Sequence, residues 1–568
     1  MATKLEIELP YGDVEAKPAH QAEEADEHSR MLLLQHVRPS DPREGEHGAE
    51  VSSSGQPYGL YYLSAVEMWE RFSYYAMRAE LVLFFEEELF ARGNWHDVIG
   101  MGLVTQLYGE PLDSLGDEER ERRVQVLASS VYGLYTSMAY FTPLAGGLLA
   151  DRYVGTARMI YLGMFLIALG HFFMVSRQLT FVALLLIAVG TGCFKPNVST
   201  QLGRLYSDSN TGLRDSGFSF FYCGINAGAA LAPLVSGQLR QMYGFPVAFL
   251  SAAFGMMVGA AVYATAHRLK RLEPHASHHH VAGNCAAAAS VEEPAEDSDR
   301  HVSAAGMSAR GTRHRRAPPS PVQTRRGLPA GRKAGLLSAR CPPSGPTGGI
   351  LLVCLLTVPF WAVYAQGGIS FVLFVDANVN RKLRGFTIPT EWFQSINPLL
   401  VIGFTPLISM LWQYLEKRGP EKGMAMSLTK MAIGPFLLAA GNFILFLACS
   451  TENAGRKINP LWPVAYVAVS TIGELFLSPV GLSFVTQAAP VGITSIMMGC
   501  WLLASCFGNY MAGFIGSFYM SIDHAPFFLM LACLAVGNGA VMLASVIPLK
   551  RILAGSKGLQ IYPVILMS

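Results

Sequence analysis

Twelve apolar segments, each long enough to cross a lipid bilayer, set the strongest limit on what this chain can fold into. A membrane-spanning helix needs about 20 mainly apolar residues, so the repeated segments predict an all-α polytopic membrane protein. A polar stretch over 267–347 separates them into two sets of six. The first six lie near 58–90, 125–150, 158–176, 179–198, 215–238 and 245–266, and the second six lie near 348–376, 393–415, 425–449, 460–487, 495–521 and 525–548.

Composition supports the membrane class and excludes several functions. Only 15% of the residues are charged, against about 25% in typical soluble domains. The net charge of +2 argues against a nucleic acid partner. The nine cysteines lack paired spacing and the histidines lack metal-ligand spacing, so neither a metal site nor a cofactor is predicted. We find no nucleophile–base pair in the spans, so an enzyme is not expected.

The polar segments suggest how the chain is divided and oriented. Two six-helix bundles are expected over 58–266 and 348–549. Residues 267–347 form a polar linker rich in Arg, His, Pro, Ser and Gly, and the positive-inside rule applied to its Arg and Lys residues places it in the cytoplasm. The polar residues 1–57 then form a disordered cytosolic tail, and 550–568 form a second cytosolic tail. We therefore predict a multi-pass protein of the plasma or inner membrane with both termini cytoplasmic.

A charged stripe in the first span is the clearest candidate functional feature. On a helix, its six residues fall at offsets 0, 3, 4, 7, 8 and 11, which is one face. These residues are Glu67, Glu70, Arg71, Tyr74, Tyr75 and Arg78. A charge at the bilayer centre costs roughly 2.5–3.5 kcal/mol, so this face should line protein or a wet cavity. Acids and arginines on one stripe can pair, exchange partners and carry a proton. The alternative is a buried ion cluster that only holds helices together.

Other polar residues stand out in later spans. Lys195 precedes Pro196 near the end of the fourth span, where it either snorkels to the interface or projects into a cavity. Asn226 in the fifth span needs a hydrogen-bond partner. Glu474 is the only acid in the interior of the last six spans, and Ser478 lies one helical turn further on. A lone buried carboxylate is a candidate for ligand binding or proton handling.

A possible gating segment follows the second span. The sequence from Gly147 to Arg158 is GLLADRYVGTAR, in which Asp151, Arg152 and Arg158 can form a charge lock at a helix end. It resembles the loop motif between the second and third helices of the major facilitator superfamily. The alternative is a solvated turn.

Four motifs carry a wider resemblance. They are ExxERFxYY at 67–75, FKPN at 194–197, FYxxINxG at 221–228 and GELxLSPxGLS at 473–483. In this order and on these spans, they resemble the proton-dependent oligopeptide transporter family (POT or PTR) of the major facilitator superfamily. The resemblance implies twelve transmembrane helices in two six-helix bundles. It also implies a proton-coupled symporter that imports di- and tripeptides by alternating access.

The resemblance further implies roles for individual residues. Glu67 and Glu70 match proton-coupling acids that interact with Arg71 and Lys195. Glu474 matches the residue that receives the peptide amino group, while Arg71 and Lys195 face the peptide carboxylate. The positions that match the substrate pocket are Arg71, Tyr75, Arg78, Tyr140, Lys195, Tyr222, Asn226, Trp361, Asn397, Glu474, Ser478 and Trp501. For Trp501 alone, a packed core position is the commoner outcome.

One departure from the family pattern concerns gating. Family members usually have an acid four residues after the tryptophan of the seventh span, where this chain has Ala365. Arg78 matches the arginine that commonly pairs with that acid as an outer gate. We therefore expect Arg78 to have another partner.

Other functions stay open at this point. A carrier of the same fold could move nitrate, an amino acid or a peptidomimetic, and it could run outward. A membrane receptor or scaffold that signals through the tail and linker is the alternative from another class. Glu474 favours a substrate with an amino group over a simple anion. The sequence predicts no oligomeric state.

Overall fold

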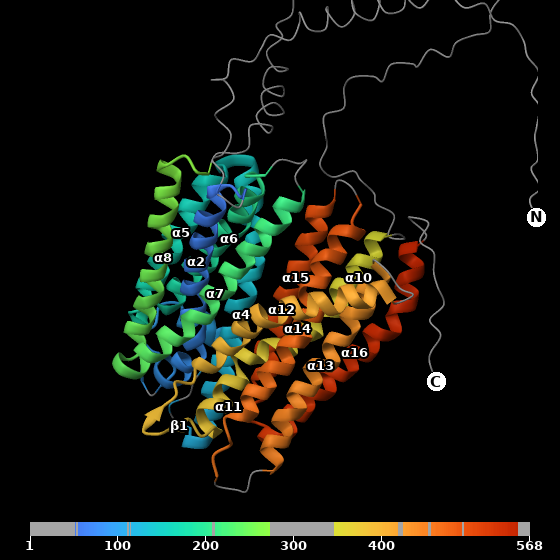
Figure 1. Ribbon diagram of the computed structural model, residues 1–568. Helices are drawn as coiled ribbons and strands as arrows, with labels where there is room; N and C mark the ends of the chain where they lie inside the picture. The colour runs from blue at the N-terminus through green and yellow to red at the C-terminus, as the bar shows by residue number, and fades with distance from the viewer. Residues whose placement is uncertain are drawn as a thin grey trace, which may run out of the picture.

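The computed structural model describes most of the two predicted bundles (Figure 1). The described residues are 52, 55–91, 93–110, 113, 115–206, 211–272, 346–418, 424–451, 456–490 and 493–554. A helix lies over each of the twelve predicted spans. The predictions for the N-terminal tail, for the linker beyond residue 272 and for the tail beyond residue 554 concern segments that lie almost wholly outside the described residues.

The first bundle contains six long helices, labelled as in Figure 1. They are α2 (Tyr58–Phe84), α4 (Asp117–Leu149), α5 (Thr156–Phe173), α6 (Thr180–Gly203), α7 (Thr211–Tyr243) and α8 (Phe245–Arg268). Shorter elements connect them: the π-helical turns η1 (Phe85–Leu89) and η2 (Ala150–Val154), helix α3 (Met101–Tyr108) and the 3₁₀ turn η3 (Arg177–Leu179).

The second bundle contains the remaining spans and one small β-hairpin. Its elements are α10 (Pro346–Tyr364), the 3₁₀ turn η5 (Ala365–Gly368), α11 (Ser370–Asn378), β1 (Lys382–Leu383), β2 (Phe386–Thr387), α12 (Trp392–Arg418), α13 (Met424–Thr451), α14 (Leu461–Ala488), α15 (Thr494–Gly516) and α16 (His524–Ala554). The two strands pair antiparallel, with Lys382 opposite Thr387 and Leu383 opposite Phe386.

Several helices differ in extent from the predicted spans. The seventh span is not one continuous helix, because η5 separates α10 from α11 at the glycine pair Gly367–Gly368. Helix α4 begins at Asp117 rather than near 125, since three acids in its first turn favour a helix N-terminus. Helix α16 continues to Ala554, past the predicted bundle end at 549, and Arg551 lies in its last turn, where a cation is favourable.

Ten helical segments within the described residues are long and apolar enough to cross a membrane. The first two predicted spans are not among them, although α2 has 27 residues and α4 has 33. The charged stripe accounts for this difference in α2, whereas in α4 the uncharged residues after Arg123 are too rich in Tyr, Ser, Thr and Gly. The chain is a multi-pass membrane protein, and a count of twelve crossings stays a prediction.

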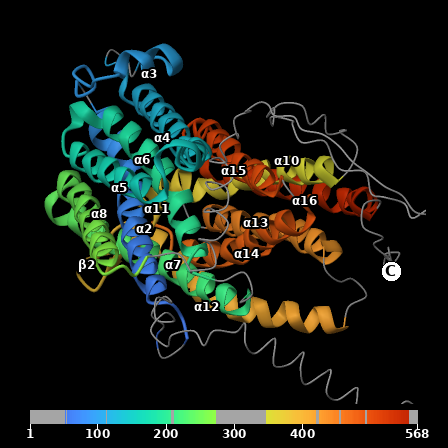
Figure 2. The same ribbon diagram turned by 90° about the horizontal axis from the view of Figure 1, so that it is seen from above.

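Two helix pairs join the bundles, as Figure 2 shows from above: α4 beside α15, and α7 beside α12. Helices α4 and α15 approach closely at glycines, since a Cβ atom on Gly133 would lie 2.6 Å from the Cα of Gly513. At the start of α12, Trp392 Nε1 donates a hydrogen bond to the Leu234 carbonyl oxygen of α7 at 3.0 Å. The contact between α7 and α12 lies at the same end of the bundles as the β-hairpin. We call this end, at the bottom of Figure 1, the hairpin end.

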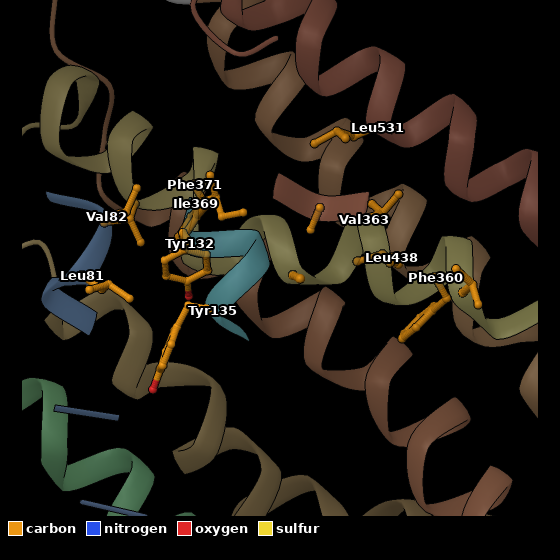
Figure 3. Packing of buried hydrophobic residues seen from close by; sticks show 14 of the residues in the cluster. Leu81, Val82, Tyr132, Tyr135, Phe360, Val363, Ile369, Phe371, Leu438 and Leu531 are labelled. Carbon is orange, nitrogen blue, oxygen red and sulfur yellow. The ribbon is translucent and has the colours of Figure 1, made fainter. Parts of the chain in front are cut away.

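The buried apolar core is continuous between the bundles. Its largest cluster takes side chains from both halves of the chain. Figure 3 shows Tyr132 of α4 near Ile369 and Phe371 of the second bundle, with Leu81 and Val82 of α2 on the other side. This shared core places the stripe of α2 beside residues that follow it by about 300 positions.

Candidate functional site

A cavity of about 340 Å³ lies between the two bundles. Helices α2, α4, α6 and α7 form one wall, and α10, η5, α11, α12, α14 and α15 form the other. All twelve predicted pocket residues line it: Arg71, Tyr75, Arg78, Tyr140, Lys195, Tyr222, Asn226, Trp361, Asn397, Glu474, Ser478 and Trp501. The sequence motifs are thus brought together in space, while the roles of the individual residues stay predictions.

On the first wall, Arg71 holds the two acids of the α2 stripe. Its Nε lies 3.3 Å from Glu67 Oε1 and 2.5 Å from Glu70 Oε2. All three side chains are buried. Glu67 and Arg71 line the cavity, whereas Glu70 is not among its lining residues. Arg71 Nη2 has no hydrogen-bond partner among the described residues, so one buried donor remains for an anionic ligand.

Lys195 lies on the cavity, which decides between the two positions that the sequence allowed. Its Nζ lies 5.0 Å from the centre of the Tyr140 ring of α4, close enough for a cation–π contact. Helix α6 continues past Pro196 to Gly203 and carries the ammonium group to the same wall as Arg71. Together with Arg78, this wall therefore presents three cations with unequal partners.

Arg78 has the alternative partner that the departure at Ala365 predicts. Its Nε donates a hydrogen bond to the Tyr132 hydroxyl oxygen at 2.8 Å. Its guanidinium carbon also lies 5.8 Å from the centre of the Tyr75 ring. No carboxylate of the described residues lies within 4.0 Å of this guanidinium group. A phenol of α4 is thus the hydrogen-bond partner of Arg78 in this structure.

On the second wall, Glu474 is held by neutral groups. Its Oε2 accepts hydrogen bonds from the Tyr364 hydroxyl at 2.5 Å and from Asn397 Nδ2 at 3.0 Å. Asn397 also donates to Thr471 Oγ1 at 2.9 Å. Among the described residues, no cation forms an ion pair with Glu474, so its charge is available to a cationic ligand. Sequence reasoning missed Tyr364, although its position one turn after Trp361 on an apolar helix was a usable signal.

The two tryptophans complete the second wall. Trp501 lines the cavity and is 2% exposed, so it is both a pocket wall and a packed side chain. Its ring lies against Gly481 of α14, where no larger side chain would fit. Trp361 Nε1 is buried and has no hydrogen-bond partner in the described part of the chain. Across the cavity, Asn226 Nδ2 donates to the Tyr222 carbonyl oxygen at 3.0 Å.

The predicted gating segment does not form a charge lock in this structure. Asp151 and Arg152 lie in η2 and Arg158 in the first turn of α5, and all three are exposed. Within the described ranges, no ion pair joins these three side chains. Gly147 lies near Pro196 of α6, with 3.7 Å between a built Cβ and the proline ring. The gating role of this segment stays a prediction.

A second charged cluster, which sequence reasoning missed, joins the bundles at the hairpin end. Arg240 of α7 contacts Glu80 of α2 and Glu391 at the start of α12. The sequence signal was weak, because Glu391 and Arg240 lie at or beyond the edges of predicted spans, where charges are usually solvated.

Together, these features define a class of protein. Two helical bundles that are sealed together at one end and enclose a charged cavity between them form the architecture of a major facilitator superfamily carrier. The model of the POT family matches residues 154–292 and 348–530. The chain therefore belongs to the POT family, whose members are transporters rather than enzymes.

Individual relatives agree with this assignment. The chain is 32% identical over 541 residues to the peptide transporter YePEPT of Yersinia enterocolitica, covering 89% of this chain and 97% of that protein. It is 28% identical over 533 residues to a di-/tripeptide transporter of Lactococcus lactis subsp. cremoris, covering 89% and 98%. Among solved structures, the peptide transporter POT in complex with sulfate matches with a TM-score of 0.66 and 26% identity, covering 88% of this chain and 96% of that one.

Proposed function

We propose that this protein is a proton-coupled symporter that imports di- and tripeptides by alternating access. The observation that carries the proposal is the charge of the two cavity walls. Arg71 and Lys195 lie on one wall, and Glu474, without a cation partner among the described residues, lies on the other. A peptide zwitterion needs cations at its carboxylate and an anion at its amino group. The related transporters from Yersinia and Lactococcus support this substrate class.

The cavity also suits a short peptide in size and in chemistry. About 340 Å³ lies near the lower end of the range of small-ligand pockets, roughly 300–1,000 Å³. Because the cavity contacts the two ends of the backbone, which all peptides share, side chains of many kinds can be accepted. A simple anion such as nitrate would use the cationic wall and leave Glu474 unpaired.

The pairing of Arg71 with two acids suggests how the proton is coupled. Glu70 contacts the Arg71 guanidinium group at 2.5 Å. Protonation of Glu70 removes this attraction and frees Arg71 to bind the peptide carboxylate. Proton and peptide then favour each other's binding, which is a positive coupling free energy between two sites. Glu67 and Lys195 belong to the same electrostatic group, since their charges act on one another.

The direction of opening follows from the predicted topology. With the N-terminus in the cytoplasm, α2 begins inside, and the hairpin end faces outside. The contacts between α7 and α12 then close the external side. Release of these contacts would open the cavity to the outside, where proton and peptide enter. We place the protein in the plasma or inner membrane, with the lipid bilayer and no nucleic acid as its surroundings.

Uptake of labelled dialanine into proteoliposomes tests the proposal. Concentrative uptake that requires an inward proton gradient and is abolished by an uncoupler is the expected result. Exchange without accumulation would support the peptide pocket and contradict the coupling. No peptide movement in folded protein would contradict the substrate, and nitrate and single amino acids would be tested next. A receptor or scaffold would accumulate none of these solutes.

A further inference from the structure

An ionic cluster at the hairpin end links three helices from the two bundles. Arg240 Nε lies 2.6 Å from Glu391 Oε1 and 3.2 Å from Glu80 Oε2. Its Nη1 lies 3.3 Å from Glu87 Oε2 of η1. Glu80 and Arg240 belong to the first bundle and Glu391 to the second. The cluster is therefore assembled only while this end of the molecule is closed.

The cluster has more buried acid than cation. The side chains of Glu80 and Glu391 are 0% exposed, whereas Glu87 is 45% exposed and can be solvated. Arg240 carries a single charge for two buried carboxylates. An uncompensated buried charge costs several kcal/mol. If both buried acids were ionised, Glu80 and Glu391 would have to share the single charge of Arg240.

The neighbouring ionisable groups do not remove this excess. Asp376 at the end of α11 faces Arg240, but its carboxylate pairs with Arg381 at 2.8 Å. Glu86 of η1 adds another acid near Glu87 and Asp376. Arg240 is thus the one cation among the described residues that forms an ion pair with Glu80 or Glu391, since Arg381 pairs with Asp376.

The two buried carboxyl groups lie close to one another. Glu391 Oε1 and Glu80 Oε2 both lie against the same Arg240 nitrogen, at 2.6 Å and 3.2 Å, and neither carboxyl group has a hydrogen-bond partner among the described residues. A hydrogen bond between the two carboxyl groups would require a proton on one of them, because ionised carboxylates accept and do not donate. The space is also tight, since a Cβ atom on Gly237 of α7 would lie 2.7 Å from Glu391 Oε2. A second cation has little room to enter.

We propose that Glu80 and Glu391 together bind one proton when the hairpin end closes. When the bundles separate at this end, both carboxylates reach solvent and the shared proton leaves one of them. Closing then takes up a proton from the solution on that side, and a lower pH there favours closure. The contact of Arg240 with Glu80 and Glu391 also joins the two bundles. It lies at the end of the molecule where Arg78, with Ala365 in place of an acid, donates a hydrogen bond to the Tyr132 hydroxyl.

This inference rests on the proposed alternation of the cavity between two sides, but its test needs no substrate. Spin labels at Asp97 in the loop before α3 and at Lys382 in β1 would report the distance between the bundles at the hairpin end. Both side chains are exposed. The labels are placed in full-length protein whose native cysteines have been replaced, and distances are measured in lipid nanodiscs from pH 5 to pH 8.

The expected result is a closed population that falls as the pH rises. Binding of one proton changes the closed-to-open ratio by up to about tenfold per pH unit. Glu80→Gln mimics the protonated acid, so this variant should stay closed. The number of protons taken up on closing, given by the slope of the closed-to-open ratio against pH, should fall by one. Glu391→Gln should reduce the slope equally, because Arg240 then has one buried acid to neutralise. Glu87→Gln is the matched control, and its slope should equal that of the wild type.

Three outcomes would overturn the inference. They are a pH-independent distance in the wild type, an unchanged slope in both Glu80→Gln and Glu391→Gln, or a loss of slope in Glu87→Gln alone. If one glutamine variant fails to fold, the other still decides. If dialanine is not transported, the proton bound by Glu80 and Glu391 can still be measured and this inference can stand. If dialanine is transported but the distance does not change with pH, this inference is wrong and the proposed function is unaffected.

Discussion

The two walls of the cavity bind charge in different ways. On the first wall, the Arg71 guanidinium group is shared between Glu67 and Glu70 within one helix. On the second wall, Glu474 is held by the Tyr364 hydroxyl and the Asn397 amide, which come from two other helices. The first wall can therefore rearrange its partners within α2, whereas the second presents one fixed charge.

This difference suggests a division of labour. A group that is already paired releases its partner only when a proton or a ligand competes for it, which is the requirement for coupling. A charge held by neutral donors is kept in position without being neutralised, which is the requirement for binding. We therefore expect substitutions on the first wall to disturb coupling and those on the second wall to disturb affinity.

The largest effect is expected at Glu474. Glu474→Ala removes the only charge that the described residues place on the second wall, and it leaves the Tyr364 hydroxyl without its acceptor, while Asn397 still donates to Thr471. Losing one partner of a buried charge pair costs roughly 2–5 kcal/mol, so the peptide affinity should fall by at least about 30-fold. Competition by dialanine in an exchange assay measures this change. Glu474→Gln keeps the hydrogen bonds without the charge; if it bound peptide like the wild type, the ionic role of Glu474 would be refuted.

A loss of a different kind is expected at Glu70. Glu70→Gln cannot exchange a proton, so gradient-driven accumulation of dialanine should disappear. Exchange of labelled for unlabelled peptide should remain at a substantial fraction of the wild-type rate, because Glu70 does not line the cavity. Comparing the two assays in the same proteoliposomes separates coupling from binding. Full accumulation in this variant would remove Glu70 from the coupling mechanism.

A smaller effect is expected at Tyr364. Tyr364→Phe removes one hydrogen bond to the Glu474 carboxylate, and a bond to a charged group contributes roughly 1.5–3 kcal/mol. Since Asn397 still holds Glu474, we expect the affinity for dialanine to fall by about tenfold, with the proton dependence unchanged. Tyr243→Phe, an exposed site on α7, is the matched control. An altered pH profile without a change in affinity would contradict the division between the walls.

The smallest effect is expected at Tyr132. Tyr132→Phe removes the acceptor of the Arg78 hydrogen bond, which should lower the thermal stability by a few degrees and slow uptake by less than about tenfold. Ala365→Glu in the Tyr132→Phe background offers Arg78 a carboxylate and should restore part of the stability. No change in melting temperature in Tyr132→Phe would show that this contact is dispensable.

Much of the fold was predictable because it depends on local pattern. The recurrence of apolar segments determines the number and approximate position of the helices, since a lipid environment leaves few alternatives to a helix. The α2 stripe predicted its own face, because residues 3 and 4 apart lie together on any helix. The four family motifs contain seven of the twelve predicted pocket residues, the wider resemblance supplied the other five, and the structure places all twelve around one cavity.

Other features depended on contacts between distant segments. Whether Lys195 points to the interface or to the cavity is decided by α4, which presents the Tyr140 ring to its ammonium group. The partner of Arg78 is Tyr132, 54 residues away on another helix. No periodicity within α2 encodes either contact.

The sequence by itself determined the membrane class, the helices and the charged face of α2, because these follow from spacing along a single segment. Only the tertiary structure decided which charges meet between the bundles. Glu80, Arg240 and Glu391 each resemble ordinary residues near a helix end, and their net excess of buried acid exists only where three helices pack together. The physical reason is that the energy of a charge depends on its partners and its burial, and both are set by packing.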